Sequence, residues 1–294
     1  MSDVPSISWL NGEYIDENKC ISRGDRGFLI GDGAFETMLI RKGVPVFLGQ
    51  HLKRLAAGLS ALHISSPVLE GSDTVFRELA HRNGLINDDA SGRLTVTRGT
   101  AGRGLASAKA GVTTILPTIF ASVASTKSNQ TKPLALHITE RLRDERFFYS
   151  GFKAISGYAE NQAARFEAEA AGADEGVMVN LDGRIACAAT ANIFIIDDNG
   201  TVITPPISEG AMPGVTRDNI INLAKSSKIS FVEAPLTMSC LRSAKAIFLS
   251  NSLIGIRRGF LGDDVGAQDL AVERLAKLYE NKLEEAYQEG RFDS

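Results

Sequence analysis

The pattern of apolar and polar positions predicts strands and helices in the first part of the chain. An apolar run at Ser6–Leu10 stops at Asn11-Gly12, a pair that favours the tight turn of a β-hairpin. Lys42-Gly43 separates two further apolar runs in the same way. From His51 to His63 the apolar positions follow helical spacing instead, which predicts an amphipathic helix built on Leu52, Leu55, Leu59 and Leu62.

A polar stretch at Ser125–Pro133 interrupts this pattern as a linker would. We therefore expect an N-terminal α/β domain at residues 1–124, a linker at 125–133 and a C-terminal domain at 134–294. The predicted fold class is α/β, or α+β, in two domains. The second domain should contain a charged C-terminal helix, a helix that ends near Ala171-Gly172, and strands at Gly176–Val179 and Ile193–Ile196.

Composition narrows the class of protein. The chain has 294 residues, of which 44% are hydrophobic and 23% charged, and its formal net charge is −3. This near balance gives no electrostatic case for binding nucleic acid or an acidic membrane surface. The sequence also shows neither a basic apolar leader nor a long uncharged apolar span. We expect a cytoplasmic enzyme that acts on a small molecule.

Cysteine and histidine usage gives no support for a disulfide framework or a metal site. The three cysteines, Cys20, Cys187 and Cys240, are odd in number and far apart, and the four histidines are scattered. Neither set has the spacing of a metal-binding motif. We therefore expect no metal.

Lys153 is the candidate for covalent chemistry. It lies in the stretch Gly151–Tyr158, and a helix starting near Ser156 would hold the phenol of Tyr158 close to it. A phenol at that place can hydrogen-bond a phenolate oxygen on a cofactor ring. Together the two side chains suit pyridoxal phosphate, with Lys153 as the Schiff-base lysine. A surface lysine and a half-buried core tyrosine are the alternatives.

A phosphate site is expected where Pro213–Arg217 leads into the helical run Asp218–Lys225. The first amide groups of a helix have no partners within the helix, so a helix N-terminus after a glycine turn is a ready site for phosphate. An ordinary capped helix start is the alternative.

Five ordered blocks, spread over nearly the whole chain, resemble the fold type IV pyridoxal-phosphate enzymes, the class IV aminotransferase family. They are Asp25–Thr37, His51–Leu55, the Lys153 segment, Ala191–Phe194 and Pro213–Arg217. This family includes branched-chain and D-amino acid aminotransferases and aminodeoxychorismate lyase. The resemblance implies pyridoxal 5'-phosphate as the cofactor, a small amino substrate and a homodimer.

The same resemblance implies roles for individual residues. Lys153 would carry the cofactor, with Tyr158 beside its ring oxygen. A guanidinium can bind phosphate through two hydrogen bonds, and two main-chain amides and a small hydroxyl would complete the phosphate cup. In this sequence the matching positions are Arg54, Val215, Thr216 and Ser252.

One position departs from the family pattern. Relatives commonly place a glutamate before Asn-Ile-Phe to hydrogen-bond the pyridine nitrogen, and this chain has Cys187 there. A carboxylate favours the protonated ring, the stronger electron sink, whereas a thiol with a pKa of about 8.5 is mostly neutral at pH 7. We expect a neutral thiol. The alternatives are a partly ionised thiol, a substitute carboxylate such as Glu160, or a different alignment of the segment.

Two loops and the thiol bear on the choice of reaction. Thr97–Gly104 resembles a loop of lyase-like members in which Arg98 and Arg103 would meet substrate carboxylates; a glycine-rich turn with exposed arginines is the alternative. Ser250–Gly255 resembles the Asn-Ser-Leu-x-Gly loop of lyases more than the Gly-Thr-Ala loop of branched-chain aminotransferases. A neutral pyridine should also harm transamination more than an elimination driven by aromatisation.

These features predict a 4-amino-4-deoxychorismate lyase, which releases pyruvate and 4-aminobenzoate and acts in folate biosynthesis. The alternative is a class IV aminotransferase of D-amino acids, branched-chain amino acids or amines. Phe35 weighs mildly against a D-amino acid enzyme, because several of those carry a tyrosine there to bind the substrate carboxylate. A second alternative is a pyridoxal-phosphate-binding protein with weak turnover, in which the missing glutamate marks degeneration.

Overall fold

The computed structural model describes residues 6–16, 19–65, 70–101, 104–105, 116–126, 132–262 and 269–292. The chain forms two compact units, and each unit is made of more than one segment of the sequence. Unit 1 comprises Met1–Ser128, Phe152–Ser156 and Ala286–Ser294, and unit 2 comprises Asn129–Gly151 and Gly157–Glu285. The first change of unit falls within the expected linker. The segment around Lys153, however, belongs to unit 1, although the sequence suggested one continuous C-terminal domain.

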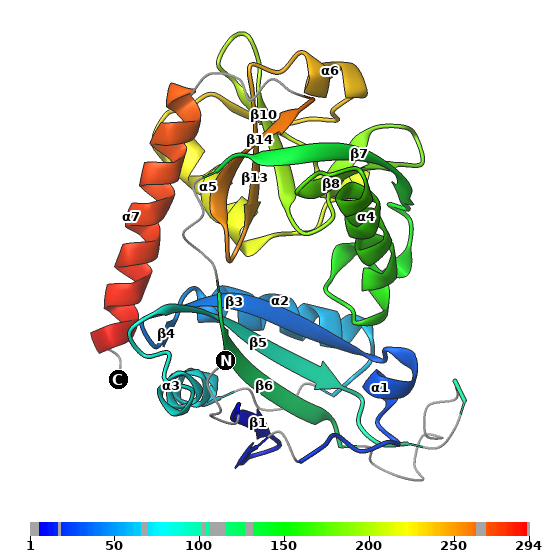
Figure 1. Cartoon of the computed structure of the whole chain (residues 1–294), viewed down its shortest axis with the longest axis vertical. Helices are drawn as coiled ribbons and strands as arrows, with labels where there is room; N and C mark the ends of the chain where they lie inside the picture. Colours follow the sequence, from blue (N-terminus) through cyan, green and yellow to red (C-terminus); the bar gives the residue numbers. More distant parts are fainter. Residues whose placement is uncertain are drawn as a thin grey trace. The chain divides into compact units, whose positions relative to one another are not determined.

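Unit 1 is built on an antiparallel sheet (Figure 1). In the described part of the chain this sheet has six strands in the order β2-β1-β6-β5-β3-β4. Its elements are β1 (Ser8–Leu10), β2 (Glu13–Ile15), α1 (Arg26–Ile30), β3 (Gly33–Arg41), β4 (Val44–Pro45), α2 (Leu48–Ala61), α3 (Ser72–Arg82), β5 (Asp89–Thr97) and β6 (Thr118–Ser125).

Both turns expected from the sequence in unit 1 are confirmed. Asn11 and Gly12 have φ values of 48° and 102° and join β1 to β2. Lys42 and Gly43 have φ values of 47° and 82° and join β3 to β4. Two successive residues with positive φ match the right-handed twist of the strands they connect.

The expected amphipathic helix is also confirmed, as α2. Leu55 and Leu59 are 2% and 0% exposed and pack with Met38 of β3 and Phe76 of α3, while Leu52 and Leu62 border the same cluster. Burying such side chains stabilises a domain by about 1.5–3 kcal/mol each, so this cluster holds α2 and α3 on the sheet.

Unit 2 contains a mixed sheet. In the described residues it has eight strands in the order β12-β11-β10-β13-β14-β7-β8-β9. The rings of Phe194 and Phe248 stack in its core, with their centres 4.7 Å apart. Its strands are β7 (Leu134–Arg143), β8 (Glu175–Asn180), β9 (Ile185–Ala188), β10 (Asn192–Ile196), β11 (Val202–Thr204), β12 (Phe231–Glu233), β13 (Ala246–Asn251) and β14 (Gly255–Leu261).

The remaining elements are helical. The 3-10 turns are η1 (Phe148–Gly151), η2 (Ser156–Tyr158) and η3 (Ile207–Glu209), and the α-helices are α4 (Ala159–Ala170), α5 (Val215–Ser226), α6 (Met238–Arg242) and α7 (Leu270–Phe292). The strands expected at Gly176–Val179 and Ile193–Ile196 and the charged C-terminal helix are confirmed as β8, β10 and α7.

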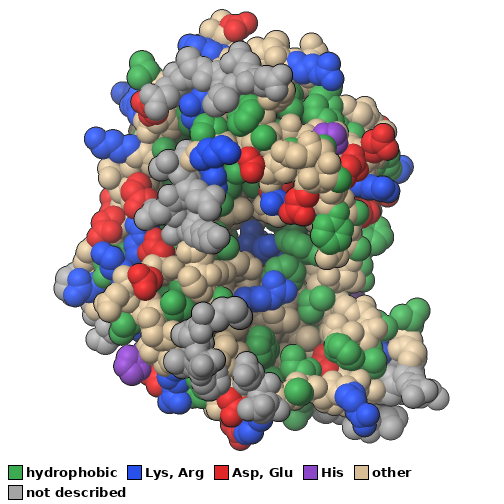
Figure 2. Space-filling view, viewed as in Figure 1, with side chains coloured by type: hydrophobic (Ala, Val, Ile, Leu, Met, Phe, Trp, Pro, Cys, Tyr) green, Lys and Arg blue, Asp and Glu red, His purple; other side chains and the backbone are tan. Residues whose placement is uncertain are grey.

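Charges of both signs are interspersed over the face drawn in Figure 2. Among the described residues, no helix is both long and apolar enough to cross a lipid bilayer. The same part of the chain holds no cluster of three or more histidine, cysteine or acidic side chains that suits a metal ion.

Candidate active site

Lys153 lies in a short extended segment beside β3. The N–H of Phe35 donates to the carbonyl oxygen of Lys153 at 3.0 Å, and the N–H of Ile155 donates to the carbonyl oxygen of Gly33 at 2.9 Å. A side chain on Gly33 would collide with the carbonyl oxygen of Val96 and with Ile155, so this close approach requires glycine. Main-chain hydrogen bonds therefore fix the lysine on both sides.

The Lys153 ammonium lies against an aromatic ring. Its Nζ atom is 4.7 Å from the centre of the Phe35 ring, and the guanidinium carbon of Arg93 is 3.8 Å from the same centre. The ring is 5% exposed, and a cation near a buried ring face is attracted to it. Phe35, expected near the substrate, is thus a direct neighbour of the lysine.

A buried carboxylate orients Arg54, the expected phosphate-binding residue on α2. Nε and Nη2 of Arg54 donate to the two oxygens of Glu36 at 2.7 and 2.6 Å, and His51 Nδ1 lies 2.7 Å from Glu36 Oε2. Burial raises the pKa of Glu36, but hydrogen bonds from Arg54 and His51 outweigh it and lower that pKa below its ordinary value. Glu36 accepts two of the five guanidinium N–H groups. The role of Arg54 toward a phosphate stays a prediction.

Burial has the largest effect on the pKa of the neighbouring imidazole, His51. His51 is 1% exposed, and its burial lowers the pKa of the ring despite the opposing effect of the Glu36 carboxylate. The ring is therefore neutral at pH 7, and the negative charge of Glu36 is directed at Arg54.

Arg98 also has fixed contacts in unit 1. Nε and Nη2 donate to the carboxylate of Asp32 at 2.8 and 3.0 Å, and two main-chain carbonyls after α2 accept further bonds at 2.7 and 3.0 Å. Burial raises the pKa of Asp32, but hydrogen bonds from Arg98 and Arg26 lower it overall. The guanidinium expected to meet a substrate carboxylate thus has a protein carboxylate as partner. Arg103 lies outside the described residues.

Helix α5 begins at Val215 without a side-chain cap. Gly214 is the N-cap residue in extended conformation, and a glycine has no side chain with which to bond the first-turn amides. A side chain at Gly214 would collide with Asn192 Oδ1, while Asn192 Nδ2 donates to the carbonyl oxygen of Met212 at 2.8 Å. Val215 and Thr216 are buried. The uncapped first turn of this 12-residue helix offers its amides to an anion.

Ser252 lies in the turn between β13 and β14. Asn251 Oδ1 shapes this turn by accepting hydrogen bonds at 2.9 Å from the amides two and three residues further on. Ser250 precedes it and is fully buried, and its hydroxyl has no hydrogen-bond partner among the described atoms. Ser250 pairs in the sheet with Asn192, which borders the α5 N-cap. An orphaned buried hydroxyl is costly, so this end of the sheet suits a polar ligand.

Cys187 is buried in β9, opposite Met178 of β8. Burial raises the pKa of the Cys187 thiol to about 11, and the Arg143 guanidinium opposes this only in part. The thiol is therefore neutral at pH 7, which agrees with the expected neutral thiol and not with the partly ionised alternative. Its place at the ring nitrogen stays a prediction. In the described part of the chain neither Glu160 nor Glu175 hydrogen-bonds the thiol, and burial raises the pKa of Glu175.

Arg143, at the end of β7, is a buried cation that acts on this thiol. Its guanidinium donates to the carbonyl oxygens of Gly210 and Ser150 at 3.3 and 3.5 Å and to Asn161 Oδ1 at 3.4 Å. The Arg143 side chain is 5% exposed, whereas Glu160, 3.8 Å from it, is 42% exposed. Among the described residues, no buried carboxylate neutralises the positive charge of Arg143.

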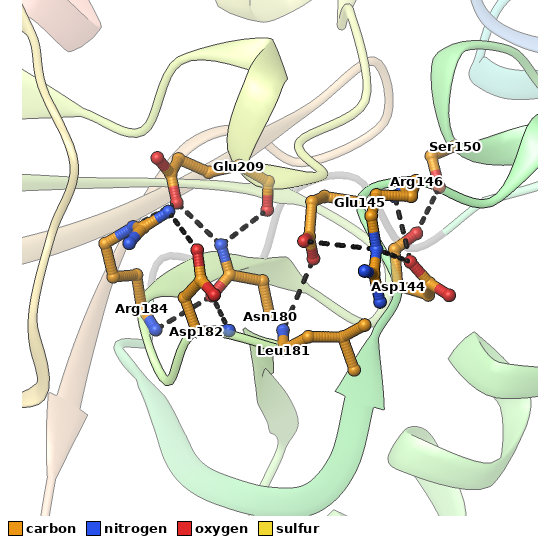
Figure 3. Close-up of polar contacts among 9 residues, drawn as sticks. All are labelled: Asp144, Glu145, Arg146, Ser150, Asn180, Leu181, Asp182, Arg184 and Glu209. Atoms are coloured by element: carbon orange, nitrogen blue, oxygen red, sulfur yellow. Dashed lines mark hydrogen bonds and ion pairs between the residues drawn. The ribbon is translucent and has the colours of Figure 1, made fainter.

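A polar network joins the turn between β8 and β9 to Glu209 and to the loop after β7 (Figure 3). Asn180 Nδ2 and Arg184 Nε both donate to Glu209 Oε2 at 2.6 Å. Glu145 Oε2 accepts a hydrogen bond at 3.3 Å from the N–H of Leu181. The turn between β8 and β9 therefore anchors both the loop after β7, which continues toward Lys153, and the segment that leads into α5.

Tyr158 occupies the position immediately before α4 and is half-buried. It is five residues beyond Lys153 in the chain but belongs to unit 2. Its role beside a cofactor ring stays a prediction.

Sequence reasoning missed Arg143 and the partnership of Glu36 with His51 and Arg54. Glu36 did carry a signal, because a charged residue within the apolar run Ala34–Ile40 implies a buried partner. Arg143 showed no such signal in the sequence, because it lies in the charged run Glu140–Arg146, which is typical of an exposed loop.

The fold and the lysine segment together define a class of enzyme. Residues 33–259 match the sequence model of the family described as amino-transferase class IV, and the chain belongs to this family. It is therefore a pyridoxal-phosphate enzyme of fold type IV, and the fold class and the cofactor expected from the sequence are both confirmed.

Relatives carry different activities. The chain is 31% identical over 282 residues, 94% of this chain and 95% of the relative, to a provisionally assigned branched-chain-amino-acid aminotransferase of Methanocaldococcus jannaschii. It is 28% identical over 255 residues, 84% of each chain, to the aminodeoxychorismate lyase of Bacillus subtilis. A branched-chain aminotransferase from Thermoproteus uzoniensis, crystallised with norvaline, has the same fold, with a TM-score of 0.84, 21% identity and 94% of each chain covered.

The residues present fit the phosphate of the cofactor better than its ring nitrogen. The uncapped start of α5 and the orphaned Ser250 hydroxyl are both suited to an acceptor-rich group. Cys187 can donate a weak hydrogen bond to a neutral ring nitrogen but offers no charge to a protonated one. At the ring nitrogen, the place expected for it from the sequence, this thiol would suit an unprotonated ring.

Proposed function

We propose that this protein is a pyridoxal-phosphate-dependent 4-amino-4-deoxychorismate lyase. The observation that carries the proposal is the buried, neutral Cys187 with the buried guanidinium of Arg143 acting on it. Both disfavour a proton on the ring nitrogen, because a neutral thiol does not stabilise the added charge and a nearby cation repels it. The proposed reaction is an elimination driven by aromatisation, which should depend less on that proton than transamination does.

When bound, pyridoxal phosphate supplies an electron sink that weakens a bond at the carbon bearing the substrate amine. Lys153 would carry the cofactor and move the proton at that carbon. In the roles that the family resemblance implies, Tyr158 would hydrogen-bond the ring oxygen, Cys187 would meet the ring nitrogen, and Phe35 would pack beside the substrate. Arg54, Val215, Thr216 and Ser252 would hold the phosphate.

The lyase reaction balances without an oxidant or a second substrate. The C–H bond at the amine-bearing ring carbon breaks, and the C–O bond to the enolpyruvyl group then breaks. The released enolpyruvate takes up a proton to become pyruvate, and the remaining ring becomes the aromatic 4-aminobenzoate, a folate precursor. Aromatisation supplies much of the driving force, so a weaker electron sink is sufficient.

The likeness to the lyase of Bacillus subtilis over 84% of the chain supports this choice. The second candidate is a class IV aminotransferase, which the likeness to the Methanocaldococcus jannaschii protein favours. The two differ in products, so one experiment separates them.

The test supplies the purified holoenzyme with enzymatically generated 4-amino-4-deoxychorismate and follows 4-aminobenzoate and pyruvate. Parallel reactions contain D-alanine or L-leucine with 2-oxoglutarate. We expect equal amounts of the two lyase products, lost in the Lys153→Ala variant. Keto acid formation in a parallel reaction without lyase products would make the protein an aminotransferase, and silence in all reactions would leave a cofactor-binding protein.

A further inference from the structure

Helix α7 carries a polar group on its buried face. Five side chains at helical spacing form this face, and each is 9% exposed or less: Val272, Leu275, Tyr279, Leu283 and Tyr287. A buried tyrosine hydroxyl normally finds a hydrogen-bond partner, so the surroundings of Tyr279 are informative. The family match ends at residue 259, so this helix lies beyond it.

Tyr279 contacts the first turn of α5. Its hydroxyl oxygen is 3.2 Å from Thr216 Oγ1, a hydrogen-bond distance, and both residues are 2% exposed. Thr216 is the second residue of α5, within the uncapped turn proposed to bind phosphate. The threonine side chain is thus held from outside its own helix.

The ring of Tyr279 also lies near the turn that carries Ser252. Gly255 ends this turn with a φ of +60°, and a Cβ atom there would lie 3.5 and 3.6 Å from two ring carbons of Tyr279. The ring therefore lies close beside Gly255, at the distance at which a side chain there would pack against it. Tyr279 is thus at hydrogen-bond distance from Thr216 and lies near the end of the turn that carries Ser252.

We propose that Tyr279 is a positioning residue for the phosphate cup of the cofactor, an inference that rests on the proposed function of Thr216 and Ser252. A phosphate only accepts hydrogen bonds, whereas the Thr216 hydroxyl has one proton to give. When Tyr279 donates to Thr216 Oγ1, that proton is directed away from the tyrosine. The ring keeps the 251–255 turn at a fixed distance from α5.

The test measures cofactor binding by the full-length apoenzyme in a Lys153→Ala background, so that affinity reports non-covalent contacts alone. We expect Tyr279→Phe to weaken pyridoxal phosphate about five- to tenfold, the effect of one hydrogen bond. Binding of pyridoxal, which lacks the phosphate, should not change. With Lys153 present, the ³¹P resonance of the bound cofactor should shift in Tyr279→Phe holoenzyme.

A double-mutant cycle with Thr216→Val tests the route of the effect. If Tyr279 acts through Thr216, adding Tyr279→Phe to Thr216→Val should weaken pyridoxal phosphate no further. Tyr287→Phe, on the same face of α7 two turns further on, is the matched control and should bind as the parent does. Tyr279→Phe keeps the ring, and its melting temperature without cofactor reports any damage to the fold.

Three results would overturn the proposal: unchanged phosphate-dependent affinity in Tyr279→Phe, an equal loss of pyridoxal and pyridoxal phosphate binding, or additive losses in the cycle. If the parent bound pyridoxal as tightly as pyridoxal phosphate, the phosphate cup itself would be wrong, and Tyr279 with it. Failure of the lyase assay with a positive result here would instead reject only the proposed reaction.

Discussion

The carboxylate of Glu36 binds the guanidinium of Arg54 through both of its oxygens, at 2.7 and 2.6 Å, and so joins β3 to α2. Glu36 is 0% exposed and directly follows Phe35, whose ring contacts the Lys153 ammonium. The strand that supports the lysine thus also orients the candidate phosphate arginine.

Replacing Glu36 with glutamine should lower the free energy of unfolding by about 3 kcal/mol, because the change leaves a largely buried guanidinium without its counter-charge. Urea denaturation at pH 7 measures the loss. Glu78→Gln is the control, since Glu78 pairs with Arg82 on the surface and should contribute less than about 1 kcal/mol. Equal effects of the two substitutions would contradict the importance of burial.

Stability should fall as the pH drops below about 6.5, the ordinary pKa of histidine. Because the pKa of His51 is lowered in the folded protein, the unfolded chain binds its proton more readily, and acid therefore favours unfolding. The lowered pKa of Glu36 adds a further loss at more acidic pH, below the ordinary value of a glutamate. His51→Asn should flatten the decline between pH 7 and 5 in denaturant titrations, and an unchanged slope would refute this origin.

Lys153→Ala should abolish both turnover and the visible absorption band that the cofactor gains through its bond to the enzyme. Borohydride reduction followed by peptide mass analysis provides the measurement. Lys245→Ala, at a side chain that is 59% exposed, is the matched control and should keep both properties. A borohydride-sensitive band that survives in Lys153→Ala would show that another lysine carries the cofactor.

Cys187→Glu should place a carboxylate at the ring nitrogen and near the buried Arg143 guanidinium. The charge pair favours a protonated ring, so the long-wavelength cofactor band should intensify or move to the red, and the transamination half-reactions should accelerate. Absorbance spectra and single-turnover mixing with amino acids measure both. Cys20→Glu changes an exposed thiol in the same way and should have no effect. If Cys187→Glu also leaves spectrum and half-reaction unchanged, Cys187 does not meet the ring.

Gly214→Ala should weaken pyridoxal phosphate at least tenfold. The new methyl group collides with Asn192 Oδ1 and displaces the first turn of α5, although the backbone conformation at this position suits alanine. Equilibrium dialysis of the cofactor gives the affinity. Gly49→Ala, at a helical glycine with open space around it, serves as the control and should bind the cofactor normally.

Local patterns predicted local structure well. The Asn11-Gly12 hairpin and the leucine spacing of α2 depend on neighbouring residues, and both are present. A helix after the Gly214 turn followed from one short motif for the same reason, although α5 begins at Val215, three residues before the expected helical run.

Contacts between distant parts of the chain could not be predicted in this way. The bonds from Lys153 and Ile155 to β3 cross more than 100 residues, and Tyr279 meets Thr216 across 63. Both contacts depend on tertiary packing, which the pattern of a single sequence does not reveal. Arg143 was missed because a β-strand buried a side chain that its charged neighbours suggested was exposed.

The return of Phe152–Ser156 to unit 1 has a consequence for any attempt to express the units separately. Cutting the chain in the expected linker would leave Lys153 on the C-terminal fragment, while its hydrogen-bonding partners on β3 would remain on the other. Neither half would keep the lysine in its native setting. Recovery of a functional lysine would require the two pieces to be co-expressed and to reassociate, so the linker is a poor site for truncation even though it is polar.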